Sequence, residues 1–186
     1  RVLYVTGNSP DAARHAARAG ALPCAGDMGG VDGVYEHGLG HGIGLQTHES
    51  PSLSRGASLV HAVEKDDAAA RAITANYESI KSAHCPGTFH LYTMSVHRFL
   101  QDKAQQTYHF IYVDPPYDVS DIDVVESLIL LRDGGFIDPQ GLIAVERNSR
   151  VKEISWPDGL TPIREKNYGQ ATIFYGSPTL TDGENG

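Results

Sequence analysis

The pattern of hydrophobic and polar residues predicts strands and helices that alternate along the middle of the chain. Short runs of apolar, mainly β-branched and aromatic residues are typical of strands buried in a sheet. Four such runs lie at residues 59–63, 89–93, 108–113 and 142–145, and a fifth at residues 2–5 stands apart from them. Between the runs, apolar residues at helical spacing predict helices over residues 67–82, 96–100 and 121–132. The alternation predicts an α/β fold.

The two ends of the chain differ from its middle. Residues 163–169 and 171–175 predict two strands around a glycine turn, which is an antiparallel hairpin. Residues 177–186 are polar and contain Gly and Pro, so we expect a disordered tail there. Residues 1–33 form an atypical amino-terminal segment, and we therefore place the main domain at residues 34–176.

Composition and charge are those of a globular protein, and they limit the kinds of partner that it is expected to bind. A chain of 186 residues with 40% hydrophobic content can form one domain with a sizeable core. No apolar run approaches membrane-spanning length and no signal-peptide pattern is present, so we expect a cytoplasmic protein that does not bind membranes. The net charge of −8 argues against a protein that grips nucleic acid mainly through phosphates. Any RNA-binding surface would therefore be a local patch.

The candidate chemistry lies at Asp114-Pro115-Pro116-Tyr117, directly after the predicted strand at 108–113. Neither proline can donate to a sheet ladder, so the strand ends there, at the sheet edge where open α/β sheets bind ligands. Asp114 and the Pro115 carbonyl could accept both hydrogens of an exocyclic amine on a nucleobase and so aim its lone pair at an electrophile. Tyr117 could stack on that base. The structural alternative is a stiff turn that carries a surface tyrosine.

A glycine-rich stretch from Val34 to Gly44 is the first candidate for cofactor binding. Glycines let the backbone approach a nucleotide-type cofactor closely, although a plain flexible loop has the same pattern. The residues assigned to this role are Glu36, Gly38, Gly40 and Gly42. Three histidines in and after this stretch, His37, His41 and His48, lack a recognised metal-ligand spacing, and we expect no metal.

Three further residues are candidates for the same cofactor. Glu64 ends the strand at 59–63, where an acidic side chain can accept both ribose hydroxyls of a nucleoside cofactor. Helix initiation, the alternative role for Glu64, is already served by the two aspartates that follow. Lys65 is assigned to the same site as its neighbour. Ser95 can contact the cofactor base from a loop, or it can cap the helix at 96–100.

A basic cluster follows the predicted strand at 142–145. Its members are Arg147, Arg150 and Lys152. Because the cluster lies beyond a strand's carboxyl end, it shares the sheet edge with Asp114 and is the best candidate for contact with RNA phosphates. A solvated loop would have a similar composition.

Several segments in one order make residues 54–176 resemble the RsmD family of bacterial 16S rRNA guanine-N2 methyltransferases. The matching segments are Ser54-Arg55-Gly56-Ala57, Val63-Glu64-Lys65-Asp66, Arg98-Phe99-Leu100, Val113-Asp114-Pro115-Pro116-Tyr117, Gly141-Leu142-Ile143-Ala144-Val145-Glu146 and Arg164-Glu165-Lys166-Asn167-Tyr168-Gly169. The departures from the family include two at predicted cofactor residues. Residues 36–42 stand where the family carries Asp-Leu-Phe-Ala-Gly-Ser-Gly, and Ser95 replaces a common Asp.

The resemblance implies a Rossmann-like class I methyltransferase that uses S-adenosylmethionine, with a mostly parallel seven-stranded sheet ending in the antiparallel hairpin. It implies methylation of the exocyclic N2 of a guanine in 16S rRNA, within the 30S subunit or an assembly intermediate, by a monomer. By this resemblance Asp114, Pro115 and Pro116 position the amine, Tyr117 packs on the guanine, and Glu64 holds the cofactor ribose. Two alternatives stay open: a catalytically silent RNA-binding or ribosome-assembly protein on the same fold, and a DNA amino-methyltransferase.

Overall fold

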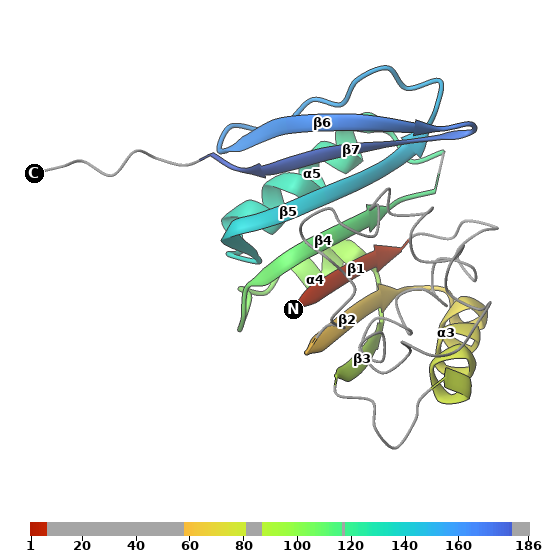
Figure 1. The fold of residues 1–186 in the computed structure, drawn as a ribbon. Coiled ribbons are helices and arrows are strands. Elements are labelled where there is room, and N and C mark those ends of the chain that lie inside the picture. Colours follow the sequence, from red (N-terminus) through yellow and green to blue (C-terminus); the bar gives the residue numbers. More distant parts are fainter. Residues whose placement is uncertain (7–57, 81–86, 117, 180–186) are drawn as a thin grey trace, which may run out of the picture.

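The fold is built on one seven-stranded sheet. The computed structural model describes residues 1–6, 58–80, 87–116 and 118–179, and their arrangement is shown in Figure 1. The strands are β1 (Val2–Thr6), β2 (Leu59–Glu64), β3 (Thr88–Thr93), β4 (Tyr108–Asp114), β5 (Ile137–Asn148), β6 (Leu160–Tyr168) and β7 (Ala171–Pro178). The described helices are α3 (Asp67–Ile80), α4 (Val96–Leu100) and α5 (Asp121–Asp133). The expected α/β fold is confirmed.

The strand order across the sheet is β3-β2-β1-β4-β5-β7-β6. The five strands from β3 to β5 are parallel, whereas β7 is antiparallel to both β5 and β6. The predicted hairpin is therefore present, and Gly169 in its turn adopts a φ of 75°, which a glycine reaches without strain. β7 extends to Pro178, one residue beyond the expected start of the tail.

β1 is the middle one of the five parallel strands, and the expected domain start at residue 34 leaves it out. β1 lies between β2 and β4 and pairs in parallel with both, so that Thr6 is opposite Asp114. A five-residue apolar run has no periodicity that separates it from any other short apolar run. The sequence therefore does not reveal that this one is central. Residues 36–42, which stand where the family carries Asp-Leu-Phe-Ala-Gly-Ser-Gly, lie outside the described residues.

The helices begin where a side chain can accept the first free backbone N–H groups. Asp66 Oδ1 accepts from the Ala69 amide at 2.8 Å and caps α3, as expected for this acid. Ser95 Oγ accepts from the Arg98 amide and caps α4, and Ser120 Oγ accepts from the Asp123 amide and caps α5. The structure thus confirms the capping alternative for Ser95. No described helix has the length and apolar character needed to cross a bilayer.

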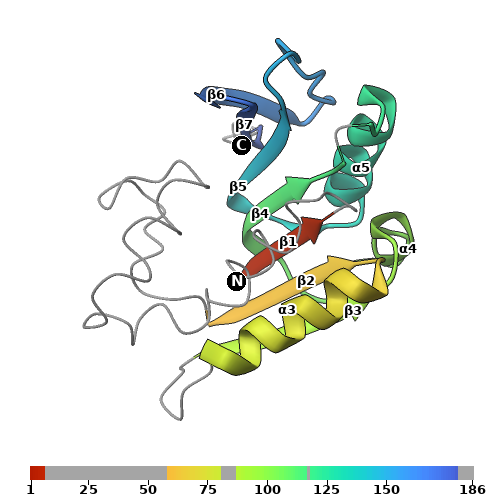
Figure 2. The ribbon, with the colours of Figure 1, turned by 90° about the vertical axis from the view of Figure 1, so that its right-hand side faces the viewer.

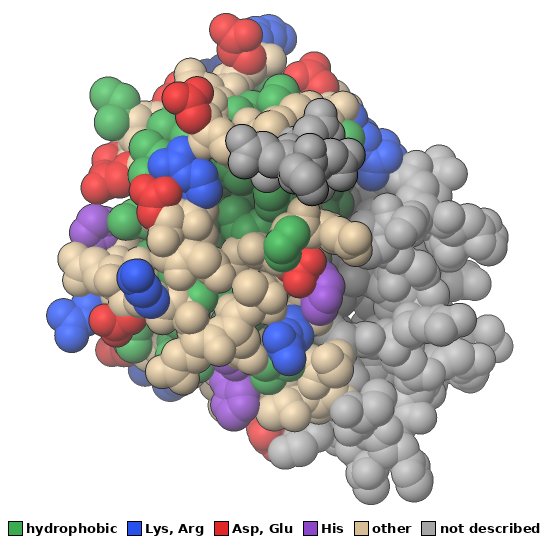
Figure 3. Space-filling model, turned by 90° about the vertical axis from the view of Figure 1, so that its left-hand side faces the viewer, with side chains coloured by type: hydrophobic (Ala, Val, Ile, Leu, Met, Phe, Trp, Pro, Cys, Tyr) green, Lys and Arg blue, Asp and Glu red, His purple; other side chains and the backbone are tan. Residues whose placement is uncertain are grey.

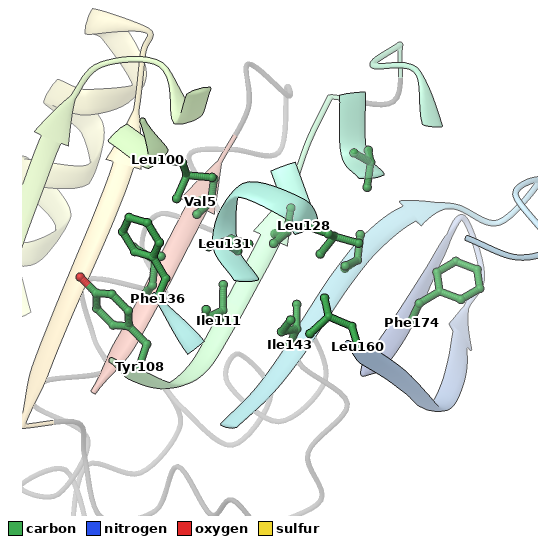
Figure 4. Close-up of a cluster of buried hydrophobic side chains, with 14 of the residues drawn as sticks. Val5, Leu100, Tyr108, Ile111, Leu128, Leu131, Phe136, Ile143, Leu160 and Phe174 are labelled. Carbon is green, nitrogen blue, oxygen red and sulfur yellow. The ribbon is translucent and has the colours of Figure 1, made fainter. Parts of the chain in front are cut away.

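The helices cover both faces of the sheet. α4 and α5 lie on the same side of it (Figure 2), and α3 packs on the opposite face through Tyr77, whose ring centroid is 4.7 Å from that of Phe89. The buried face of α5 is formed by Val124, Leu128 and Leu131, none more than 3% exposed. They meet the β4 and β5 side chains in the cluster of Figure 4.

The apolar residues of α5 do not all face the core. Ile122 shares one face of the helix with Val125 and Ile129 by spacing, but it is 79% exposed. The apolar residues of this helix are too numerous for spacing alone to identify the buried stripe. The contacts with β4 and β5 identify it instead.

The buried His61 predicts a loss of stability in acid. Its Nδ1 is 2.6 Å from the Tyr108 hydroxyl, and desolvation, followed by repulsion from His90, lowers the pKa of His61 from 6.5 to about 4. The unfolded chain therefore binds more protons between these two pKa values, and the free energy of unfolding falls as pH drops from about 6.5 to 4. The contribution of His61 to this fall is at most about 3 kcal/mol.

Urea unfolding of the wild type and of His61→Gln at pH 7.5 and pH 4.5 measures this contribution. The variant is expected to lose part of the difference between the two pH values, because it has no imidazole to protonate. His97→Gln is the matched control, since His97 is exposed on α4 and should leave the pH dependence unchanged. Equal pH dependence in all three proteins would contradict the assigned role of His61.

Candidate active site

A cavity of about 210 Å³ opens at the carboxyl edge of the sheet, between α4, α5 and the ends of β1 and β4. Its walls include Val5, Val113 and Val124, which give it an apolar interior. Parallel strands bring the loops at their carboxyl ends to one edge, which explains why this edge gathers residues distant in sequence. Four of the predicted site residues line this cavity: Lys65, Ser95, Pro115 and Pro116.

Asp114 ends β4 at the same edge and is only 2% exposed. β4 is buried along almost its whole length, as predicted, so the carboxylate is held on a rigid central strand rather than on a loop. The two prolines end the strand directly after it. Tyr117, the last residue of the motif, lies outside the described residues, as do Glu36, Gly38, Gly40 and Gly42. Their roles stay predictions.

Glu64 ends β2 and lies on the same face of the sheet as Asp114. Its side chain has no exposed surface, and its Oε1 accepts a hydrogen bond from the Asp66 amide at 2.7 Å. The carboxylate therefore organises the turn that leads into α3. Its predicted contact with a cofactor ribose stays a prediction.

Glu146 is a third buried acid at this edge, and sequence reasoning gave it no role in the site. It lies in β5 and is 6% exposed. Val113 pairs with Val145, so Asp114 and Glu146 follow as the next positions on two adjacent strands. The available signal was an acid directly after the apolar run from Leu142 to Val145.

Arg147 corrects the reading of the basic cluster. It was expected to contact RNA phosphates, but it is only 4% exposed. Its Nη2 donates to the Val119 carbonyl at 2.7 Å and to Asp121 Oδ1 at 2.9 Å. The side chain therefore anchors the loop between the Asp-Pro-Pro turn and α5, and within the described residues its Nε and Nη1 have no partner. Arg150 and Lys152 are exposed, and their predicted contact with RNA is untested.

Replacing Arg147 with methionine should loosen this loop. We expect the free energy of unfolding to fall by about 1–2 kcal/mol, because hydrogen bonds of a buried charged group are lost while most of the side-chain volume is kept. Chemical denaturation with urea measures the change. Arg150→Met is the control, and an exposed substitution of this kind should change stability by less than about 0.5 kcal/mol. Equal losses in both variants would argue against the anchoring role.

Charge is distributed without a dominant basic surface on the side at which the parallel strands begin. Figure 3 shows this side, with Lys and Arg interspersed with Asp and Glu. Within the described ranges, no group of three or more His, Cys, Asp or Glu side chains is placed to hold a metal ion. The candidate site lies at the opposite edge, where the parallel strands end. The described groups there are carboxylates, backbone carbonyls and the apolar walls of the cavity.

The sheet order, the cavity and the Asp-Pro-Pro turn together define a class I methyltransferase fold. The comparisons with known proteins agree with this class. A family model with the description "Conserved hypothetical protein 95" matches residues 44–177, and the chain belongs to that family. A second model, metallopeptidase family M24, matches residues 6–76. The described residues in this range are 6 and 58–76, which form the last residue of β1, the strand β2 and most of the helix α3. No curated protein matches the chain.

Solved structures from three bacteria have the same fold. The candidate methyltransferase yhhF of Escherichia coli is 25% identical with a TM-score of 0.57, over 68% of this chain and 66% of that protein. A candidate methylase of Haemophilus influenzae is 23% identical with a TM-score of 0.57, over 69% of this chain and 77% of that one. A conserved hypothetical protein of Streptococcus pyogenes is 19% identical with a TM-score of 0.58, over 96% and 86% of the two chains. The chain thus spans just under two thirds of yhhF.

Proposed function

We propose that this protein transfers a methyl group from S-adenosylmethionine to the exocyclic N2 amine of a guanine in 16S rRNA. The observation that carries the proposal is the position of Asp114 and Pro115 at the carboxyl end of central strand β4, beside the apolar cavity. The family membership and the likeness to yhhF support the same class of reaction. The expected setting is the cytoplasm, with a monomer acting on the 30S subunit or an assembly intermediate.

The cavity has the character that a nucleoside cofactor requires. Its valine-rich walls suit a flat ring, and Ser95 and Lys65 add polar residues to its lining. S-adenosylmethionine, when bound, supplies an electrophilic methyl group on a sulfonium. Lys65, Ser95, Pro115 and Pro116 would hold it at the edge of the sheet, next to Asp114.

The chain contributes to the reaction mainly by positioning. Asp114 and the Pro115 carbonyl accept the two amine hydrogens, which directs the nitrogen lone pair toward the methyl carbon. Held in this way, the nitrogen would take the methyl group from the sulfonium, which would leave as a thioether, and would then give up a proton. Because that nitrogen is acidic once it is methylated, no strong base is required. Tyr117 would stack on the guanine, and Arg150 and Lys152 are exposed for contact with phosphates.

A catalytically silent RNA-binding protein on this fold is the second candidate function. The observation that favours it is the sequence of residues 36–42, which differs from the Asp-Leu-Phe-Ala-Gly-Ser-Gly that the RsmD family carries at the predicted cofactor loop. Cofactor binding therefore separates the two candidates.

Calorimetric titration of the full chain with S-adenosylmethionine and with its demethylated product is the test. Saturable binding, followed by formation of N2-methylguanosine in undermethylated 30S subunits, is the expected result. Binding is detected as heat, and the product by mass spectrometry of digested RNA. A folded protein that binds neither compound would overturn the proposal in favour of the silent protein. Binding without a methylated nucleoside in any RNA would overturn the assigned substrate.

A further inference from the structure

A second cavity, of about 320 Å³, lies beside α4, and the proposed reaction gives it no task. α4 and its cap border both cavities, because Ser95 and Val96 line the first while Arg98 and Phe99 line the second. The walls that face the two cavities are therefore no further apart than the diameter of a helix with its side chains, about 10–12 Å. A chain molecule that reaches the first cavity can also reach the second.

Aromatic rings line the second cavity. The ring centroid of Phe99 is 5.0 Å from that of Tyr92 and 5.7 Å from that of Phe136, so these three rings are continuous. Tyr108 and Phe136 are buried in the cluster of Figure 4, whereas Tyr92 and Phe99 are half-buried. Rings of this kind stack on unpaired nucleobases, and the stacking tolerates any base because every base has a π-face.

The buried polar side chain of this cavity, His61, is uncharged at neutral pH. It is 7% exposed, and its Nδ1 lies 2.6 Å from the Tyr108 hydroxyl and 3.4 Å from Gln106 Nε2. Desolvation, followed by repulsion from His90, lowers the pKa of His61 to about 4. The interior of the cavity thus combines aromatic rings with neutral hydrogen-bonding groups, which is the environment that suits an uncharged heterocyclic base.

The rim of the second cavity is cationic. Arg98, Asp102 and Lys103 line it and are exposed, so two positive charges outnumber one negative charge. No ion pair joins Arg98 or Lys103 to another residue in the described ranges. This local excess contrasts with the net charge of −8 of the whole chain. Cationic side chains at the mouth of an aromatic cavity suit the phosphates that flank a nucleobase.

We propose that the second cavity binds one unpaired nucleotide of the RNA substrate, close in sequence to the methylated guanine. Tyr92 and Phe99 stack on its base, and Arg98 and Lys103 contact the adjacent phosphates. The rim favours an anionic ligand and the rings favour a flat one, and a nucleotide is both. Proteins read RNA mainly at single-stranded segments whose bases are free to stack in this way. The choice of RNA over a free nucleotide rests on the proposed function, because the reacting guanine would then lie near the first cavity on the same strand.

The first test measures how the full chain binds short single-stranded RNA that carries 2-aminopurine, a base whose fluorescence falls when it stacks. Tyr92→Leu should weaken binding roughly 5- to 100-fold, as for the loss of one stacked base, and should abolish the fall in fluorescence. Tyr92→Phe keeps the ring and should behave as the wild type does. Calorimetric binding of S-adenosylmethionine should be unchanged in both variants.

The second test separates the phosphate contacts from stacking. The association constant falls with salt concentration, and on logarithmic axes each phosphate contact to a single strand adds about 0.7 to the slope. Arg98→Gln and Lys103→Gln should each reduce the slope by about 0.7, whereas Tyr92→Leu should leave it unchanged. Arg71→Gln is the matched control, because Arg71 is exposed on α3, on the opposite face of the sheet. The two substitutions at the exposed rim test the cavity even if Tyr92→Leu does not fold.

The outcomes separate this inference from the proposed function. If the wild type forms N2-methylguanosine but the Tyr92 and Arg98 variants keep its RNA affinity, fluorescence change and salt slope, the second cavity is not an RNA site and the methyltransferase stands. If Tyr92→Leu loses calorimetric binding of guanosine monophosphate but keeps that of RNA, the cavity takes a free nucleotide and the assignment to RNA is overturned. If RNA binding depends on the cavity but no N2-methylguanosine forms, the proposed function fails, and the cavity is the RNA site of a silent protein.

Discussion

Asp114→Ala is expected to lower the rate of methyl transfer on the order of 10²- to 10³-fold, while binding of S-adenosylmethionine changes little. Alanine removes a preorganised acceptor at the reacting amine. Loss of one such electrostatic group from an active site typically lowers the rate by this factor. Asp114→Asn should lose less, because the amide oxygen still accepts one amine hydrogen. Single-turnover rates on undermethylated 30S subunits measure both variants.

Asp118→Ala is the control for this experiment. Asp118 is exposed and follows the same turn, so its loss tests whether any acid in this loop matters. Circular dichroism and urea unfolding establish that each variant is folded. Wild-type turnover in a folded Asp114→Ala protein would remove the residue from the mechanism.

Leu128→Ala is expected to lower the free energy of unfolding by about 2–5 kcal/mol, the range for large-to-small changes in a packed core. Leu128 has no exposed surface and lies where α5 packs on β4 and β5. Native domains have a free energy of unfolding of about 5–15 kcal/mol, so this one change removes a large part of it. Urea unfolding monitored by circular dichroism provides the value.

Ile122→Ala on the same helix is the matched control. Ile122 is 79% exposed, so its truncation leaves no cavity and should change stability by less than about 0.5 kcal/mol. The comparison also tests the corrected inward face of α5. If the two variants were equally destabilised, the assignment of Leu128 to the core and Ile122 to the surface would be wrong.

The sequence predicted those parts of the site that depend on local chemistry. The run that became β4 is apolar on both faces and is stopped by two prolines, so the position of Asp114 at a strand's carboxyl end follows from neighbouring residues alone. The same holds for Asp66, which caps α3 because a free N-terminal amide lies within reach of its side chain. Such features need only a few consecutive residues.

Features that depend on distant contacts could not be predicted in this way. A basic residue after a strand suggests a solvated contact with phosphate, but Arg147 is buried because Asp121 and the Val119 carbonyl lie against it. Nothing near Arg147 in sequence indicates those partners. The position of Glu146 next to Asp114 on the adjacent strand is likewise a property of strand register, and register is set by the whole sheet.

The central place of β1 has a consequence for the order of folding. Val2 pairs with both Val60 and Phe110, so the first residues of the chain are bonded to its middle and to its second half. Contacts this distant in sequence raise the contact order, and chains with high contact order cross their folding barrier slowly. The parallel sheet is divided into β2–β3 and β4–β5 until β1 enters between them. During synthesis β1 can pair with β2 only after Glu64 has been made and with β4 only after Asp114, so one of its edges stays unpaired for longer than the other.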